Sequence, residues 1–511
     1  MIHILPELNI IGDPVLIIKR ASIILTAAVA LLLLLLLSNG TPNEKSSILI
    51  AAPGLPELNG RISVFDPKRD GFLPNVYEGL VRFKPETCQI EPCLATGWRL
   101  SPDGRTFTFE LRRNVLFHNG QRLNADLVKA SFEHTLRNAS PFLFGMVESV
   151  SSPDARHVAF QLNHPYTPFL RNLALPQAAV SLPGHPPSGT GPFRIKSAND
   201  HEVTLAAFKD YWNGVPRVES ISVKAVPDLG RRVALLRKEA KVIALDIPYS
   251  SARSLTGGTT TVTTAASLSY LGFYTSKSPF DNPAARRAVA LALDRNLLCK
   301  RLFYGLVTEA GGLLPPVVLE GQDSQTQTAD PAVSRNLAGT AGLNGKTLTL
   351  LTYKGTKPYN PAGGERLAEE VRRQLQDAGF KVRVRCYEWE ALKKAIARQE
   401  GDIFLYGWVS DNGDPDNFLY CLLSGSQSTR GFNTTRYENP VINLLLSRAQ
   451  QVPDSPVRAK IYRQALEILN RELPLVALNY GAHVAAVTPG IQGFTVYPTG
   501  TYHLREIKLK N

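Results

Sequence analysis

The stretch from residue 346 to residue 408 constrains the fold of this chain more than any other. Strand patterns alternate there with amphipathic helix patterns, in the order strand 347–353, helix 365–378, strand 381–387, helix 389–398 and strand 403–408. This order predicts a parallel sheet with right-handed crossovers. Ligands of open parallel sheets bind beyond the carboxyl ends of the strands. The loops that follow these strands are therefore where a binding site is expected.

The loop after the last of these strands is rich in acids and amides. Its polar side chains are Asp411, Asn412, Asp414, Asp416 and Asn417. An acidic loop at the end of a buried strand can receive a cationic group of a ligand. The alternative interpretation is ordinary turn chemistry, because Asn-Gly-Asp-Pro is typical of turns and its acids would then face water.

The loop after the first strand holds cations and an aromatic side chain, namely Lys354, Lys357 and Tyr359. Parallel strands place this loop and the acidic loop at the same edge of the sheet. A cation and an anion on one rim, with aromatic side chains beside them, suit a zwitterion. Its amine would bind an aspartate and its carboxylate a lysine, each through a charge-assisted hydrogen bond.

Residues 21–37 are uncharged and end in seven consecutive leucines, directly after Lys19 and Arg20. This arrangement predicts either a secretory signal with a long n-region, cut after Gly40, or a membrane anchor. In both cases the chain that follows is exported. No Cys follows the leucines, so a lipoprotein attachment signal is not expected. A buried core helix is the remaining interpretation, but a run of leucines without a polar face fits a core poorly.

The chain of 511 residues is long enough for several domains, and 44% hydrophobic with 20% charged residues is typical of a globular protein. The net charge of +13 can draw an exported protein to anionic lipid or to acidic ligands. Nucleic acid is not an expected partner, because the basic residues are scattered. The five Cys leave at least one thiol unpaired; Cys88 and Cys93 could bridge a short loop, whereas Cys299 and Cys386 are expected to be buried.

No catalytic motif is present: the chain lacks GxSxG, HExxH, a Walker loop and a GxGxxG after a strand. His118 and His483 are expected to be structural. Asp414 and Asp416 could act as an acid–base pair, but acids at this spacing in a turn more often cap backbone amides. We therefore expect no enzyme, no cofactor and no metal site.

Turn and cap residues delimit further elements outside the parallel stretch. Strands are predicted at 48–51, 106–111, 157–162, 202–208, 220–226 and 242–247, and helices at 124–136, 229–239 and 281–303. Asp281-Asn282-Pro283 is a strong helix start.

Several short motifs occur in the order of a known family. They are Tyr-Glu-Gly-Leu at 77–80, Leu-Ala-Thr-Gly-Trp at 94–98, Ser-Pro-Asp-Gly at 101–104, His-Asn-Gly at 118–120, Gly-Thr-Gly-Pro-Phe at 189–193 and Asp-Tyr-Trp at 210–212. With the acidic loop, these motifs resemble family 5 of the extracellular solute-binding proteins, the peptide- and nickel-type receptors of ABC importers. Within the family the chain is most similar to the dipeptide receptors.

The resemblance implies an α/β, two-lobed periplasmic-binding-protein fold that closes by hinge motion. Lobe I would comprise residues 41–75, 186–273 and 481–511, with an inserted subdomain at 76–185. Lobe II would span 274–480 and contain the parallel sheet. Residues 1–40 would be the leader or anchor.

The resemblance also implies a site. Asp411 matches the aspartate that takes a peptide's amino group. Lys357 matches the position where dipeptide receptors hold an Arg for the carboxylate, and a lysine loses the bidentate fork. Trp389 and Trp408 match pocket-wall tryptophans, with core packing as the alternative, and Tyr359 completes the set. Asp414 and Asp416 are expected to shape the turn.

The implied function is capture of short peptides in the periplasm by a monomer, which delivers them to an ABC permease in the inner membrane. Two alternatives keep the fold. One binds a nickel chelate, haem, glutathione or an opine, and the other is a membrane-tethered sensor or chaperone. Asp411 with Lys357 favours an amino-acid-derived zwitterion over a metal complex.

Overall fold

The computed structural model describes residues 46–56, 70–138, 141–183, 188–255, 258–319 and 328–510. The expected leader at 1–40 lies outside these ranges. Within them, no helix combines the length and the apolar character that crossing a membrane requires. The chain divides into a unit that ends at Ser47 and a second unit from Ile48 to Asn511, and the architecture below is that of the second.

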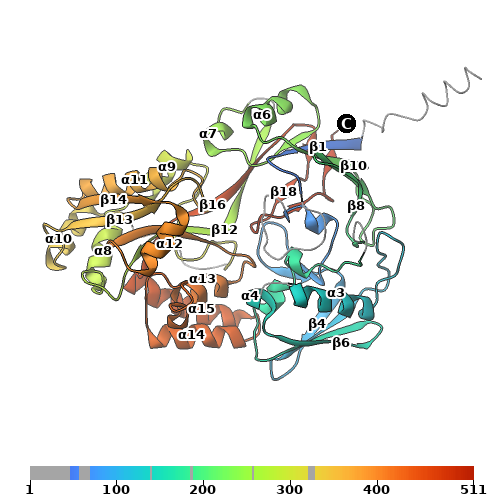
Figure 1. Cartoon of the computed structure of the whole chain (residues 1–511), viewed down its shortest axis with the longest axis horizontal. Coiled ribbons are helices and arrows are strands. Elements are labelled where there is room, and N and C mark those ends of the chain that lie inside the picture. The colour runs from blue at the N-terminus through green and yellow to red at the C-terminus, as the bar shows by residue number, and fades with distance from the viewer. Residues whose placement is uncertain are drawn as a thin grey trace, which may run out of the picture. The chain divides into compact units, whose positions relative to one another are not determined.

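One mixed sheet organises the described part of the second unit (Figure 1). Its strand order is β14-β13-β15-β12-β16-β11-β1-β10-β9-β8. The bounds are β1 Ser47–Ala52, β8 Phe193–Ala198, β9 Glu202–Ala207, β10 Ser220–Ala225, β11 Val242–Ala244, β12 Thr259–Phe273, β13 Thr347–Tyr353, β14 Lys381–Tyr387, β15 Ile403–Val409 and β16 Leu475–Val487.

Two long strands, β12 and β16, connect the two halves of this sheet. They pair with each other in antiparallel fashion, while β12 also pairs with β15 and β16 also pairs with β11. The expected boundary between residues 480 and 481 therefore falls inside a strand that both halves share. The fold class is mixed α/β around a large central sheet, as expected from the sequence.

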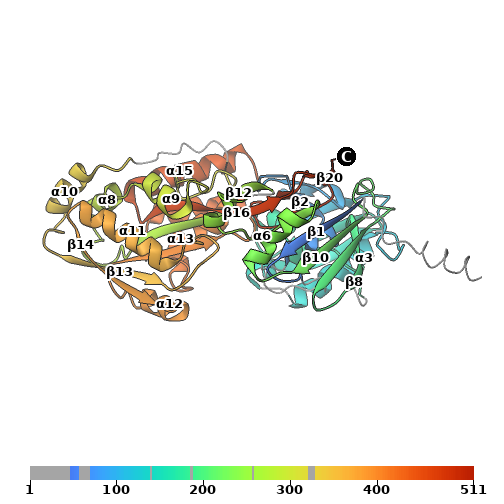
Figure 2. The ribbon, with the colours of Figure 1, turned by 90° about the horizontal axis from the view of Figure 1, so that it is seen from above.

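The β-α-β-α-β prediction is confirmed. The helices are α11 Gly364–Asp377 and α12 Trp389–Ala397. Strand β13 pairs in parallel with β14 on one side and with β15 on the other. The first right-handed crossover, from β13 to β14, and the second, from β14 to β15, run in opposite directions along the sheet. Helices α11 and α12 therefore cover opposite faces of the sheet (Figure 2). The predicted apolar face of α11 is buried, with Leu367, Val371 and Leu375 wholly covered.

The block from residue 76 to residue 185 has its own sheet and its own hydrophobic cluster, which runs from Leu80 to Leu182 and includes Tyr497. The sheet order is β4-β5-β7-β6. Elements of the block are β2 Val81–Phe83, β3 Ile90–Pro92, β4 Ala95–Leu100, β5 Thr106–Leu111, α3 Ala125–Asn138, α4 Pro141–Phe144, β6 Val147–Asp154, β7 His157–Leu162, α5 Phe169–Asn172 and the 3-10 turn η3 Pro176–Ala178. Strands β5 and β7 match their predicted bounds, and Asn124 accepts the Leu127 amide at 2.9 Å as the expected cap of α3.

The predicted helix at 281–303 is two helices, α8 Pro283–Leu291 and α9 Arg295–Phe303. Asn282 caps the first as expected, but Asp294 accepts the Leu297 amide and starts a second helix. A capping aspartate inside an apolar period therefore ended the first helix early.

The other described elements are short strands, helices and turns. They are the 3-10 turn η2 Leu73–Asn75, α6 Leu229–Lys238, α7 Tyr249–Ala252, α10 Pro331–Thr340, α13 Pro415–Leu423, the 3-10 turn η4 Gly425–Gln427, α14 Pro440–Gln451, α15 Pro456–Glu472, β17 Ile491–Gln492, β18 Thr495–Val496, β19 Tyr502–His503 and β20 Lys508–Leu509.

All five Cys are free, so Cys88 and Cys93 do not bridge their loop. The two thiols have different neighbours: Cys93 Sγ lies 3.5 Å from a Glu78 oxygen, whereas Cys88 packs against Gly413. Cys299 is buried as expected. The expectation that Cys386 is buried is wrong, because β14 is the edge strand of the sheet and leaves this side chain exposed.

Candidate functional site

The carboxyl ends of β13, β14 and β15 bring the predicted site residues to one edge of the sheet. The parallel register aligns Leu350 with Val384 and with Ile403, so β13 and β14 end together and β15 runs three residues farther in the same direction. Lys357 and Tyr359 follow β13, Trp389 follows β14, and Trp408 and Asp411 lie at the end of β15. We call this edge, defined by these five residues, the rim.

Asp411 receives no hydrogen bond or ion pair from any described residue, although its carboxylate is only partly exposed. Burial raises the pKa of its carboxyl to about 6. A desolvated carboxylate in this state gains most from a ligand cation, because such a cation replaces the hydration that folding removed.

Lys357 is the cation among the five rim residues. Its Nζ lies 3.9 Å from the centroid of the Trp389 ring. Among the described residues, no carboxylate lies within ion-pair distance of this ammonium. Burial and the neighbouring Lys393 lower the pKa of Lys357. Lys354 in the same loop differs, because its Nζ is bound to Glu388 at 2.8 Å.

Trp389 supports Lys357 and is itself held by aromatic side chains. Its ring stacks on Tyr406 with centroids 5.0 Å apart and planes at 13°. The edge of Tyr353 meets it at 5.6 Å and 90°. Trp389 therefore packs against the core, as the core-packing alternative expects, and its ring also carries the Lys357 ammonium, while its role as a pocket wall stays a prediction.

Trp408 and Tyr359 differ in how far they can reach a ligand. Trp408 is partly exposed, and its indole donates a hydrogen bond to Asn417 Oδ1 at 2.8 Å. Tyr359 is only 4% exposed. Its ring covers Gly407 so closely that a Cβ there would lie 2.2 Å from a ring carbon. The Tyr359 side chain thus shapes the loop that carries Lys357.

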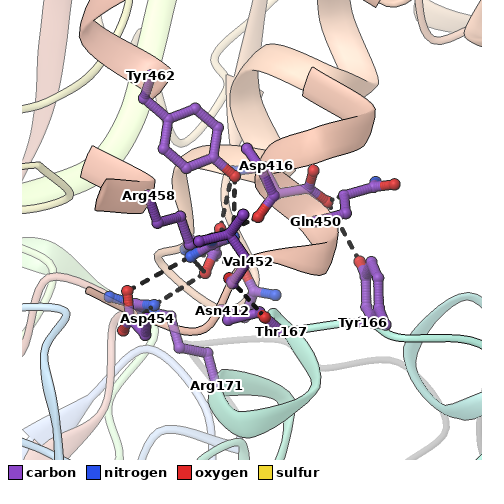
Figure 3. Close-up of polar contacts among 12 residues, drawn as sticks. Tyr166, Thr167, Arg171, Asn412, Asp416, Gln450, Val452, Asp454, Arg458 and Tyr462 are labelled. Carbon is purple, nitrogen blue, oxygen red and sulfur yellow. Dashed lines mark hydrogen bonds and ion pairs between the residues drawn. The ribbon is translucent and has the colours of Figure 1, made fainter. Parts of the chain in front are cut away.

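Asp414 forms a buried ion-pair cluster beside the rim that the sequence did not predict (Figure 3). Arg458 donates to both Asp414 oxygens, at 2.7 and 2.9 Å, and Arg171 donates to Oδ2 at 2.9 Å. Asp414 also caps α13, accepting the Asp416 amide at 2.9 Å. Burial alone would raise the pKa of this carboxyl, but the charges of Arg458 and Arg171 outweigh burial and lower it to about 2.

Asp416 adds a second buried carboxyl to this cluster. Tyr166 and Gln450 each donate to its Oδ2 at 3.2 Å. Burial, and then the charge of Asp414, raise its pKa to about 7. Both acids are almost fully buried, at 0% and 3% exposure, so the interpretation that the acids of this turn face water is wrong for them. We call Asp414, Asp416, Tyr166, Arg171 and Arg458 the junction.

His118 and His483 are half-buried, and each lies beside a backbone carbonyl. His118 Nε2 is 3.0 Å from the Gly191 carbonyl, and its ring meets the face of Phe208 edge-on at 5.0 Å. His483 Nε2 is 3.3 Å from the Pro498 carbonyl. Within the described ranges, no three or more His, Cys, Asp or Glu side chains are grouped closely enough to hold a metal ion.

Three cavities in the described part of the chain lie away from the rim. One of about 270 Å³ is lined by Arg287 and Arg295, and one of about 180 Å³ surrounds Glu78. A third, of about 440 Å³, opens between the turn at 101–104 and Gln451, close to the junction. None of the five rim residues lines these three cavities.

Comparison with known proteins assigns the family. The model of the bacterial extracellular solute-binding proteins, family 5 Middle, matches residues 89–430, more than half of the chain. The dipeptide-binding protein of Escherichia coli K12 is 28% identical over 510 residues, which cover 91% of this chain and 95% of that protein. Heme-binding protein A of Haemophilus influenzae is 29% identical, over 83% of this chain and 85% of that protein.

A solved structure agrees with these sequence relatives. HbpA2 of Haemophilus parasuis superposes with a TM-score of 0.83 at 27% identity, over 91% of this chain and all of that chain. These matches are to binding proteins and not to enzymes. The chain belongs to family 5 of the bacterial extracellular solute-binding proteins.

Proposed function

We propose that this protein captures short peptides in the periplasm, as a monomer, and delivers them to an ABC permease of the inner membrane. The observation that carries the proposal is a pair of unpartnered charges on one rim. Asp411 is a desolvated carboxylate, Lys357 is an ammonium held on an aromatic face, and neither forms an ion pair with a described residue. By contrast, the nearby buried charges of Asp414, Arg171 and Arg458 are paired with one another.

A peptide with free ends matches this pair. Its α-ammonium would bind Asp411 and its carboxylate would bind Lys357, each as a charge-assisted hydrogen bond. Trp408 and the ring of Trp389 would contact the groups between the two ends. The likeness to the dipeptide-binding protein of Escherichia coli supports this ligand class.

The test is calorimetric titration of the protein with pools of di- to pentapeptides, after partial unfolding and refolding to strip co-purified ligand. Free peptides should bind, and N-acetylation should weaken binding strongly. Lys354→Gln and Lys357→Gln form a matched pair from one loop. Only the second variant should weaken binding of peptides with a free carboxylate, because Lys354 is already paired with Glu388.

A second candidate keeps the fold and the rim but changes the ligand. Trp389, Tyr406, Trp408 and Phe432 form an aromatic surface, and haem is the ligand named for the Haemophilus influenzae relative. Absence of binding to every peptide pool, together with a haem absorption band in the stripped material, would replace the peptide proposal by this one.

A further inference from the structure

The turn that carries Asp411 is held by hydrogen bonds or packing contacts at each of its remaining positions. We call residues 410–414 the anchor turn. Inside it, Ser410 Oγ accepts the Gly413 amide at 2.9 Å, and Asn412 Oδ1 accepts the Asp414 amide at 3.0 Å. These bonds fix the backbone of the turn, but they do not fix the turn relative to its surroundings.

The surroundings come from the block at 76–185. Asn412 donates to Asn172 Oδ1 at 2.7 Å, and both side chains are buried. Gly413 lies directly on Cys88, because a Cβ added there would be 2.5 Å from the Cys88 Cβ. Asp414 accepts from Arg171. Three consecutive residues of the anchor turn thus meet three residues that precede them by more than 200 positions in the chain.

Arg171 connects three of the residues around the anchor turn, namely Cys88, Asp414 and Asp454. Its Nε donates to the Cys88 carbonyl at 3.2 Å, and its Nη1 donates to Asp414 at 2.9 Å and to Asp454 at 2.8 Å. The side chain is 9% exposed. Figure 3 shows it reaching up from the lower ribbon toward Asp454. Arg458 holds Asp414 from within residues 274–480, so Arg171 supplies the link to the other block.

We propose that Arg171 and Asn172 are positioning residues for the ligand. They hold the anchor turn against the block at 76–185 and thereby aim the Asp411 carboxylate at the ligand's ammonium group. The strength with which the protein binds an amine would then depend on a contact between two blocks that are distant in the sequence. This inference rests on the proposed function for its ligand, but the contact itself can be tested without one.

The experiment compares the full chain with Arg171→Met, Asn172→Ala and the conservative Arg171→Lys. Arg82→Met serves as the matched control, because Arg82 pairs with Glu91 at 2.7 Å inside the same block and does not touch the anchor turn. Two quantities are measured. One is hydrogen exchange of the backbone amides of Gly413, Asp414 and Asp416 without ligand, and the other is the affinity for alanyl-leucine and for its N-acetyl form.

In Arg171→Met, we expect exchange at 413–416 to accelerate and affinity for alanyl-leucine to fall at least about tenfold, with a smaller loss in Asn172→Ala. Arg171→Lys should restore part of the exchange protection and part of the affinity for alanyl-leucine, since a lysine can still reach Asp414. Affinity for the N-acetyl form should not change, and Arg82→Met should match the wild type. A role limited to overall stability would lower the melting temperature and leave the preference for the free amine intact.

Unchanged exchange at 413–416 in both Arg171→Met and Asn172→Ala would overturn the inference, whatever the ligand. Accelerated exchange with unchanged affinity for alanyl-leucine would overturn it as well. If the wild-type protein binds no peptide with a preference for the free amine, the proposed function fails, and the exchange data still decide whether Arg171 holds the anchor turn.

Discussion

The rim and the junction lie next to each other and share the turn at 410–414, yet their charges have opposite surroundings. Asp411 on the rim has no partner among the described residues, and its carboxyl has a pKa of about 6. Asp414 in the junction binds two arginines and has a pKa of about 2. Burial affects both acids, so the arginines account for the difference. The junction therefore keeps its carboxylate ionised and paired, whereas the rim keeps a desolvated charge available for a ligand.

The largest expected effect is the loss of the junction's central pair. Asp414→Ala leaves Arg458 buried at 2% side-chain exposure without its carboxylate, and should lower the free energy of unfolding by about 3–5 kcal/mol. The measurement is the denaturant midpoint by circular dichroism. Glu110→Ala breaks the exposed pair with Arg156 and should change the free energy of unfolding by less than about 1 kcal/mol.

The ion pair between Asp414 and Arg458 should also make the stability of the fold decrease at acidic pH. The folded pKa of Asp414 lies below the usual value of 3.8, so its contribution is complete above that pH and is lost as the pH falls toward 2. The stability difference between wild type and Asp414→Ala should shrink in this window. A constant difference from pH 5 to pH 2 would contradict the pairing.

Asp411→Asn should have opposite effects on binding and on stability. Loss of the carboxylate should weaken binding of a free-amine peptide by about 2–5 kcal/mol. The ligand-free protein should become more stable at pH 7, by about 1–2 kcal/mol, because an unpaired desolvated charge is removed. Titration calorimetry and thermal unfolding of the stripped protein measure the two effects. A stability loss equal to that of Asp414→Ala would show that Asp411 has a structural partner.

The pH dependence of ligand binding follows from the same carboxyl. Its folded pKa of about 6 lies above 3.8, so protonation stabilises the ligand-free fold and competes with a bound ammonium as the pH falls below 6. Peptide affinity should therefore decrease by about tenfold for each pH unit below 6. The Asp411→Asn variant should show a flat profile between pH 7 and pH 5.

A moderate effect is expected at the other end of the rim. Lys357→Met should weaken the binding of peptides with a free carboxylate about tenfold and leave the binding of C-amidated peptides unchanged. Trp389→Leu removes the ring under the ammonium, where the contact is 3.9 Å, and should cost about 0.5–1 kcal/mol in the same comparison. Equal losses for amidated and free peptides would mean that Trp389 acts only through its own contact with the ligand and does not position Lys357.

The rim could be predicted from sequence, because it depends on local periodicity and on one topological rule. The strand and helix patterns at 346–408 are local, and parallel pairing places the ends of β13, β14 and β15 at one edge. The junction could not be predicted. Arg171 and Asp414 are 243 positions apart, and an arginine near Phe169 in a short helix has no pattern that distinguishes it from a surface residue. Turn chemistry explained the cap of α13 but not the burial of its acids.

Among the junction residues, the smallest expected effect on stability belongs to Tyr166, whose hydroxyl donates to Asp416 Oδ2 at 3.2 Å. Tyr166→Phe removes this bond and should lower stability by about 0.5–1.5 kcal/mol at pH 8. The pKa of Asp416 is about 7, so the carboxyl is ionised at pH 8 and accepts the bond strongly, whereas at pH 5.5 it is protonated. The difference in unfolding free energy between Tyr166→Phe and wild type should accordingly be smaller at pH 5.5. An equal difference at both values would mean that Asp416 keeps one protonation state, and that the junction, unlike the rim, contains no carboxyl that titrates near neutral pH.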